Sequence, residues 1–422
     1  MNISKLKELK NSTLLKNTVM LYILQFSSYF LSLAVVPYQT RVLGPVVFGR
    51  IGFACGVITY FQLFMDFGFL LSATEDISKN RDNPAYINKK LTSITILKVF
   101  LGIISFAVLL GICFTVPKFR EDPWLYVLYL ISAISNAFIP DYLYRGIEKM
   151  TAITVRTVCI KVFFTVMVFV FVKDAGDYLI IPGLLCIGNT VAAIAAYLHV
   201  IKKLGYSFAK VTKEDIKADF RRSLFFFFSR IASTVYSTTN TIILGFIDKE
   251  GIVTGYYTAS EKVRTTAANC LSPISDSLYP YMVKNRDFKL VKKLLLLFMP
   301  VILTGCVVVG IFAKPICVLV FGEDYAGTAP VLIAMLPAIA AILPNYIFGF
   351  PVLGAMGLSN YANYSIFVGT GVHIAGLTVL ALTGNMNYIT LAGMMSVSEI
   401  CILITRITCV VKNKDKLKEA EQ

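Results

Sequence analysis

The chain consists of long apolar stretches separated by short polar ones. Twelve of the apolar stretches are each about long enough to cross a hydrocarbon core of roughly 30 Å, which needs about 20 helical residues. The predicted spans are 17–38, 46–70, 91–116, 124–144, 152–172, 178–201, 220–247, 252–279, 291–312, 327–349, 360–382 and 388–411. The pattern therefore predicts an all-α polytopic membrane protein with twelve transmembrane helices and no room for a separate soluble catalytic domain.

The loops between these stretches alternate between lysine-rich and lysine-poor. Of the 40 Lys and Arg residues, 26 fall in loops on one side and 7 in loops on the other. Because basic residues are retained in the cytoplasm, both termini are predicted to be cytoplasmic, which requires an even number of spans. The net charge of +15 then lies mostly at an inner rim that faces anionic lipid head groups. No nucleic-acid partner is expected, since no basic face carries interleaved aromatic residues.

The longest basic loop divides the chain into two halves of six spans. We predict an N-lobe over 1–201, a cytoplasmic linker over 202–222 and a C-lobe over 223–422. A short repeat supports the division, because Leu43-Gly44 ends the first span and Leu244-Gly245 ends the seventh. Transporters with such repeats commonly bind substrate between the repeats. The prediction is therefore two pseudo-symmetric lobes around a central cavity.

Polar residues inside the spans are the candidates for function, because they are costly in lipid and face water, substrate or one another. In the seventh span Arg230, Ser233, Ser237 and Asn240 recur every three to four residues and form one stripe. The stripe has two interpretations, a hydrated cavity or close helix packing through hydrogen bonds. The arginine favours the cavity.

The spans contain more positively charged side chains than helix packing alone requires. This excess suits an anionic cargo. The predicted cavity lining is Arg41, Arg50, Lys98, Lys161, Arg230, Lys262 and Asn240. Structural ion pairing is the alternative for each cation. Arg156, Asp276 and Arg406, near the inner face, are expected only to extend their head groups to the interface.

Three intramembrane carboxyls, Asp66, Asp141 and Glu261, are candidates for coupling to H⁺ or Na⁺, because burial makes proton binding to a carboxyl more favourable. The alternative is that each neutralises a neighbouring cation. Glu261 and Arg264, for example, are three residues apart and are able to pair on one helix.

Metal and cofactor sites are not predicted. The nine cysteines lie in or beside apolar spans without a C-x-x-C pair, and the two histidines are far apart in sequence. This pattern supports neither a disulfide framework nor a metal site.

Six fragments, in order and spacing, resemble the O-antigen and capsular oligosaccharide flippases, the polysaccharide transporter family of the multidrug/oligosaccharidyl-lipid/polysaccharide exporter superfamily. The fragments are TRVLGPVVFG (40–49), ATEDIS (73–78), YRGIEKM (144–150), YSTTNTIILG (236–245), GYYTASEK (255–262) and FGEDY (321–325). The chain departs from the family where Arg145 replaces a frequent glutamine, and where an arginine near Glu75 is missing.

The resemblance implies a fold and a function. It implies two six-helix lobes around a cationic cavity that opens alternately to each side of the bacterial cytoplasmic (inner) membrane. It also implies a cargo of undecaprenyl-diphosphate-linked oligosaccharide carried to the outer leaflet, with membrane lipids and polysaccharide polymerase machinery as further partners.

Three alternatives remain. A cation-coupled multidrug antiporter would line its cavity with acids and aromatic residues rather than Lys98, Lys161 and Arg230. A lipid-linked peptidoglycan-precursor flippase usually has fourteen spans. A membrane enzyme would need a sizeable outer loop, so we expect no catalytic residues.

Overall fold

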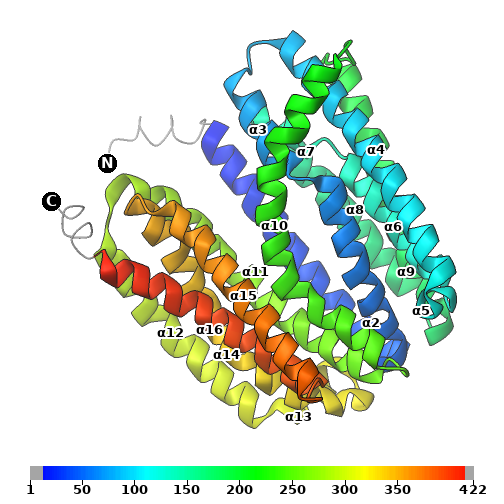
Figure 1. Cartoon of the computed structure of the whole chain (residues 1–422), viewed down its shortest axis with the longest axis vertical. Coiled ribbons are helices and arrows are strands. Elements are labelled where there is room, and N and C mark those ends of the chain that lie inside the picture. The colour runs from blue at the N-terminus through cyan, green and yellow to red at the C-terminus, as the bar shows by residue number, and fades with distance from the viewer. Residues whose placement is uncertain (1–12, 414–422) are drawn as a thin grey trace. The chain divides into compact units, whose positions relative to one another are not determined.

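The structure is a computed structural model that describes residues 13–413, including all their side chains except those of 13–19, 21–26, 28–30, 32, 33 and 229. Within this part every regular element is a helix (Figure 1). Each of the twelve predicted spans coincides with a helix or with one arm of a broken helix. By length and hydropathy alone, nine helical segments of the described residues qualify as spans. Helices α10 (Lys213–Ile247) and α11 (Ile252–Asn285) do not, because both carry charged and hydroxyl side chains along their length.

The first and second spans form one long helix, α2 (Thr13–Asp66), with a kink at Gly44. Gly44 has φ +68°, a left-handed conformation that glycine adopts without a steric penalty. Pro45 follows it and cannot donate to the helical hydrogen-bond ladder. The two residues together therefore separate the arms of α2 at the position that the hydrophobic pattern predicts.

Contacts divide the chain into two units, which we call unit 1 (1–35 and 54–231) and unit 2 (36–53 and 232–422). The division falls inside α2 and α10. It differs in detail from the predicted lobes 1–201 and 223–422 with their linker, and those boundaries stay a prediction.

Unit 1 contains the other helices up to the middle of α10. They are α3 (Phe69–Lys79), α4 (Pro84–Thr115), α5 (Pro117–Arg120), α6 (Pro123–Phe138), α7 (Asp141–Gly146), α8 (Met150–Phe171), η1 (Ala175–Leu179), α9 (Ile180–Leu198) and η2 (His199–Lys203). Helix α9 packs against α6 and α8, and α3 packs against α7 and α4. Fully buried Ile87, Leu91, Leu143 and Val200 lie in the core between them.

Local sequence sets where these helices begin and end. The side chain of Asn83 accepts a hydrogen bond from the Tyr86 amide at 3.1 Å, and Pro84 occupies the first turn of α4. Both residue types are favoured at these positions. Pro140 separates α6 from α7, so the fourth predicted span is a helix with a break near one end, preceded by an extended Ile139.

Unit 2 contains the rest of α10, α11 and the helices that follow. These are α12 (Phe288–Ile311), α13 (Ala313–Phe321), η3 (Glu323–Thr328), α14 (Ala329–Ile347), η4 (Phe348–Gly354), α15 (Ser359–Leu382) and α16 (Tyr388–Lys412). Helix α14 packs against α11, α12 and α16, and α16 also packs against α15. Leu343 and Leu353 are fully buried in one core cluster, and Tyr257 and Met335 in another.

Glycine allows the backbone of α2 to touch that of α11 within unit 2. A Cβ atom at Gly49 would lie 2.0 Å from the Gly251 carbonyl oxygen, and one at Gly255 would lie 2.1 Å from the Pro45 carbonyl oxygen. Both glycines belong to sequence fragments on which the family resemblance rests. These fragments therefore fix a helix contact.

We expect Gly49→Ala to destabilise the protein, because the new methyl group would collide with the backbone of Gly251. A backbone atom cannot move aside by a change of rotamer, as a side chain can. Overpacking of this kind costs about 1–3 kcal/mol, and thermal unfolding of the purified protein in detergent measures it. Gly305→Ala on α12 is the matched control, since a Cβ there meets nothing within 4 Å. Equal melting temperatures for the two variants would contradict the tight contact.

Candidate functional site

A cluster of charged side chains lies inside unit 1, contributed by α2, α4, α7 and α10. Lys98 is 5% exposed, and its Nζ donates to the Ala137 carbonyl and lies 5.1 Å from the centroid of the Tyr142 ring. Asp66 accepts a hydrogen bond from Gln62 at 3.3 Å. The charges of Lys98, Arg230 and Asp141 all act on the Asp66 carboxyl. The structure therefore brings together four of the predicted site residues, Asp66, Lys98, Asp141 and Arg230.

Arg156 on α8 extends this cluster, and the expectation that it only reaches the interface is wrong. Its Nη2 donates to Asp141 Oδ1 at 2.6 Å, and its side chain is 12% exposed. The Nε atom of Arg156 is buried and has no hydrogen-bond partner among the described residues. One donor of this guanidinium is thus left without a bond.

The remaining predicted cations lie elsewhere. Lys161 is half-buried on α8. Arg41, on α2, belongs to unit 2, where its guanidinium donates to the Leu319 carbonyl. Arg50 and Lys262 are exposed. A role for these residues in lining a cavity stays a prediction.

Unit 2 contains a buried ion-pair network centred on Arg264. Its Nε and Nη2 donate to the two carboxylate oxygens of Glu261 at 2.8 and 2.6 Å, which confirms the pairing that their spacing predicts. Arg264 Nη1 lies 3.8 Å from Glu399 Oε1. Asn345 Nδ2 donates to Glu399 Oε2 at 2.8 Å and to the Glu399 carbonyl at 3.0 Å.

Arg406 continues this network, and the expectation that it extends to the interface is wrong. Arg406 is 7% exposed. Its Nε donates to Ser365 Oγ at 2.9 Å, and its Nη1 donates to the Asn345 carbonyl. Carbonyl and hydroxyl acceptors at the buried position satisfy the guanidinium, so it does not need to reach water.

Asn240, from the predicted stripe on α10, lies in a fully buried hydrogen-bond network. It is 0% exposed, and its Nδ2 donates to Tyr257 Oη and to the Leu391 carbonyl, both at 3.0 Å. Its Oδ1 faces His373 Nε2 at 3.1 Å, and His373 Nδ1 lies 2.9 Å from Ser398 Oγ. The network joins α10, α11, α15 and α16.

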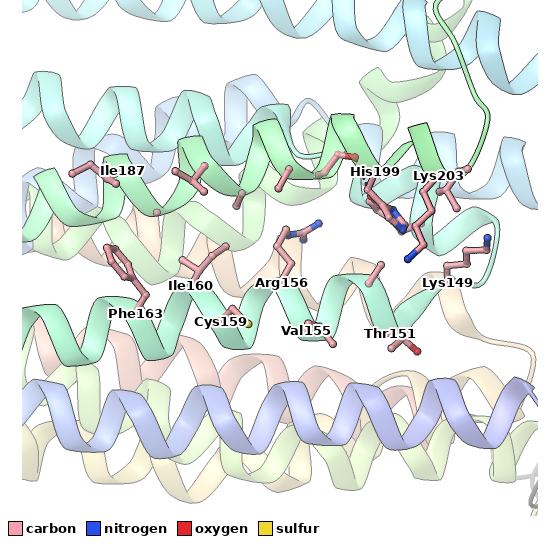
Figure 2. Close-up of a pocket in the computed structure, with 18 of the residues that line it drawn as sticks. Lys149, Thr151, Val155, Arg156, Cys159, Ile160, Phe163, Ile187, His199 and Lys203 are labelled. Carbon is pink, nitrogen blue, oxygen red and sulfur yellow. Dashed lines mark hydrogen bonds between the residues drawn. The ribbon is translucent and has the colours of Figure 1, made fainter. Parts of the chain in front are cut away.

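A groove of about 1190 Å³ lies between α8 and α9 of unit 1. Figure 2 shows Lys149, His199 and Lys203 at one end, Phe163 and Ile187 at the other, and Arg156 between them. Its walls are otherwise mostly aliphatic. Sequence patterns did not indicate this feature, because its two sides are separate spans.

Comparison with known proteins gives the family. The profile of the family described as "Polysaccharide biosynthesis protein" matches residues 14–286, which is more than half of the chain. The chain belongs to this family. The resemblance read from the sequence fragments is confirmed. A relative from Escherichia coli (strain K12), named "Putative O-antigen transporter", is 27% identical over 297 residues that cover 70% of each chain.

Solved structures show the same fold for this member of the polysaccharide biosynthesis family. The lipid II flippase MurJ in an inward closed conformation matches with a TM-score of 0.67 at 12% identity, covering 96% of this chain and 90% of that one. An inward-facing multidrug resistance MATE family transporter of the MOP superfamily matches with a TM-score of 0.66 at 14% identity, covering 96% and 99%. The predicted twelve-helix membrane fold is thereby confirmed, and the protein is a multi-pass membrane protein.

One charged cluster in unit 1 of this family member was not predicted from the sequence. Lys90 Nζ lies 2.8 Å from Asp76 Oδ2 and also donates to Asp219, while Arg222 pairs with Asp76 and, at 3.3 Å, with Glu75. The available signal was the fragment ATEDIS, which contains both Glu75 and Asp76. Their partner Arg222 comes from a distant part of the chain.

We expect Arg264→Met to destabilise the protein strongly, because it leaves the buried carboxyls of Glu261 and Glu399 without their shared cation. Breaking a buried pair costs about 3–5 kcal/mol. Thermal unfolding in detergent is the measurement, with the exposed neighbour Lys262→Met as the control. The double variant Glu261→Gln/Arg264→Met should recover part of the loss. A melting temperature for Arg264→Met as high as that of Lys262→Met would show that the network contributes little.

Proposed function

We propose that the protein is a flippase that moves undecaprenyl-diphosphate-linked oligosaccharide repeat units from the cytoplasmic to the outer leaflet of the bacterial inner membrane. The product would serve O-antigen, capsule or exopolysaccharide synthesis. The family match and the relative named as an O-antigen transporter support this class. The likeness to MurJ and to a MATE transporter does not distinguish their cargoes, because both structures match equally well.

The main support for an anionic cargo is the excess of positive charge inside the spans of unit 1. Four cations, Lys98, Arg156, Lys161 and Arg230, accompany two acids, Asp66 and Asp141. An anion that enters this region completes the charge balance. Arginine binds phosphate oxygens through two parallel hydrogen bonds, and lysine acts as a point charge.

Transport is proposed to proceed by alternating access between the two lobes, with both termini in the cytoplasm. A membrane potential that is negative inside favours outward movement of an anion by about 2.3 kcal/mol per charge per 100 mV. Two phosphate charges would gain about 4–5 kcal/mol at that potential. No covalent step is needed, so this function requires no catalytic residue.

Removal of a positive charge from unit 1 should impair transport more than protein production. We expect Lys161→Met and Arg230→Met each to lower surface polysaccharide about tenfold or more, because a charged hydrogen bond contributes about 1.5–3 kcal/mol. Surface polysaccharide is measured in cells that lack their own transporter, with membrane protein levels checked by immunoblot.

Arg230→Lys should retain more transport than Arg230→Met, and the exposed Lys292→Met on α12 serves as the matched control. Wild-type amounts of polysaccharide in both methionine variants would count against the proposed cationic path.

Coupling to an ion gradient is a second part of the proposal, with Asp66 as the preferred group because the charges of Lys98, Arg230 and Asp141 act on its carboxyl. We expect transport in proteoliposomes to respond to an imposed H⁺ or Na⁺ gradient, and Asp66→Asn to lose that response while it still exchanges cargo downhill. Asp82→Asn, on an exposed loop, is the control. Wild-type transport that ignores both gradients would leave the membrane potential as the driving force.

A further inference from the structure

The groove between α8 and α9 combines an apolar trough with a cationic end. Val155, Ile160 and Phe163 line it from α8, and Ile187 and Val191 line it from α9. Figure 2 shows Ile160 and Phe163 in the space between the two helices, with the basic residues Lys149 and Lys203 at one end. A groove with a long apolar part and a positively charged end matches an amphiphilic ligand that has an apolar chain and an anionic head.

The positive charge at this end is not compensated by nearby acids. Within the described part of the chain, neither Lys149 nor Lys203 takes part in an ion pair. Both lie close enough to His199 for their charges to act on its ring. The single acid of the lining, Glu148, is held by Arg81 at 2.9 Å.

A hydrogen bond with Tyr144 fixes the orientation of the His199 ring in the groove lining. Tyr144 Oη donates to the Ala196 carbonyl at 3.1 Å, so it accepts from His199 Nδ1 at 2.9 Å. The Nε2 atom of the neutral ring is then a hydrogen-bond acceptor. Deeper in the groove, Arg156 lines the wall while its Nη2 donates to Asp141 Oδ1 at 2.6 Å.

The dimensions match one leaflet of a bilayer. From Thr151 to Phe163 the α8 wall is about 18 Å long at 1.5 Å per residue, and half of a 30 Å hydrocarbon core is about 15 Å. The volume of about 1190 Å³ exceeds the roughly 300–1,000 Å³ of sites for drug-sized ligands. The lysine distribution predicts that the basic end lies at the cytoplasmic rim.

We infer that this groove binds the lipid diphosphate of the cargo, with the diphosphate between Lys149 and Lys203 and the first isoprenoid units along Val155, Ile160 and Ile187. This inference rests on the proposed function. Two lysines, Lys149 just before α8 and Lys203 at the end of η2, suit two linked phosphates better than the single charge of a phosphodiester head group. The groove is then the docking position of the carrier lipid in the leaflet where the cargo is loaded.

Cys159 provides the test, because it lines the groove and is exposed. Cys270 on α11 is also exposed and lies outside the groove, so it is an internal control. Maleimide labelling of both is followed by peptide mass spectrometry on the full chain in nanodiscs of neutral lipid, with geranylgeranyl diphosphate as the probe. At a probe concentration ten times its Kd, we expect labelling of Cys159 to slow about tenfold by mass action and labelling of Cys270 to stay unchanged.

Variants and competing ligands separate the sources of binding. Lys149→Ala/Lys203→Ala should lose the protection, and Lys202→Ala, an exposed neighbour that does not line the groove, should keep it. Equal protection by geranylgeraniol would indicate an apolar groove only. Equal protection by phosphatidylglycerol in the nanodisc would indicate a general anionic-lipid site. Either result, or protection that survives in the double variant, overturns the proposal.

The polysaccharide assay in cells reports the proposed function separately. If polysaccharide is restored but Cys159 is not protected, the proposed diphosphate site in the groove is wrong and the flippase function still stands. Protection of Cys159 in a protein that never restores polysaccharide would overturn the flippase function and leave a prenyl diphosphate site.

Discussion

The cost of placing charge in a region of low dielectric constant constrains this structure more than any other single factor. Within the spans, a charged side chain needs a partner of opposite sign or a set of hydrogen-bonding groups at the same depth. Arg264 meets this need with two carboxylates, and Arg406 meets it with carbonyl and hydroxyl oxygens. Each solution joins several helices, because no one helix provides all the partners. The charges therefore determine which helices pack together.

The two units compensate their buried charges differently. In unit 2 the charges of Glu261, Arg264, Glu399 and Arg406 balance within one network. In unit 1 the intramembrane cations outnumber the acids, and Arg156 keeps an unbonded donor. A network with equal numbers of positive and negative charges holds helices together at a low cost in free energy. A network with excess positive charge is stabilised when an anion binds to it. This contrast is the reason that the cationic path of the proposed function is placed in unit 1.

Much of the fold could be predicted from the sequence because hydrophobic length is a local signal. A span of about 20 apolar residues is visible without any knowledge of its neighbours, and the break at Gly44-Pro45 follows from the backbone preferences of two adjacent residues. The ion pairs are different. Lys90 on α4 and Asp219 on α10 are 129 residues apart, and only the folded structure brings them together. The sequence predicted that Lys98 and Arg230 face a common cavity, but it did not predict that Asp66 and Asp141 lie near them.

The same reasoning explains why the predicted stripe on α10 contains residues in two kinds of surroundings. Helical period places Arg230 and Asn240 on a similar face, but period alone does not say what lies opposite each turn. Arg230 lies near the acid Asp66, while Asn240 is enclosed by α11, α15 and α16 and bonds to three of their groups. Along one helix, a polar stripe thus serves electrostatics at one end and packing at the other. The two interpretations of the stripe are therefore not exclusive, since depth and neighbouring helices decide between them residue by residue.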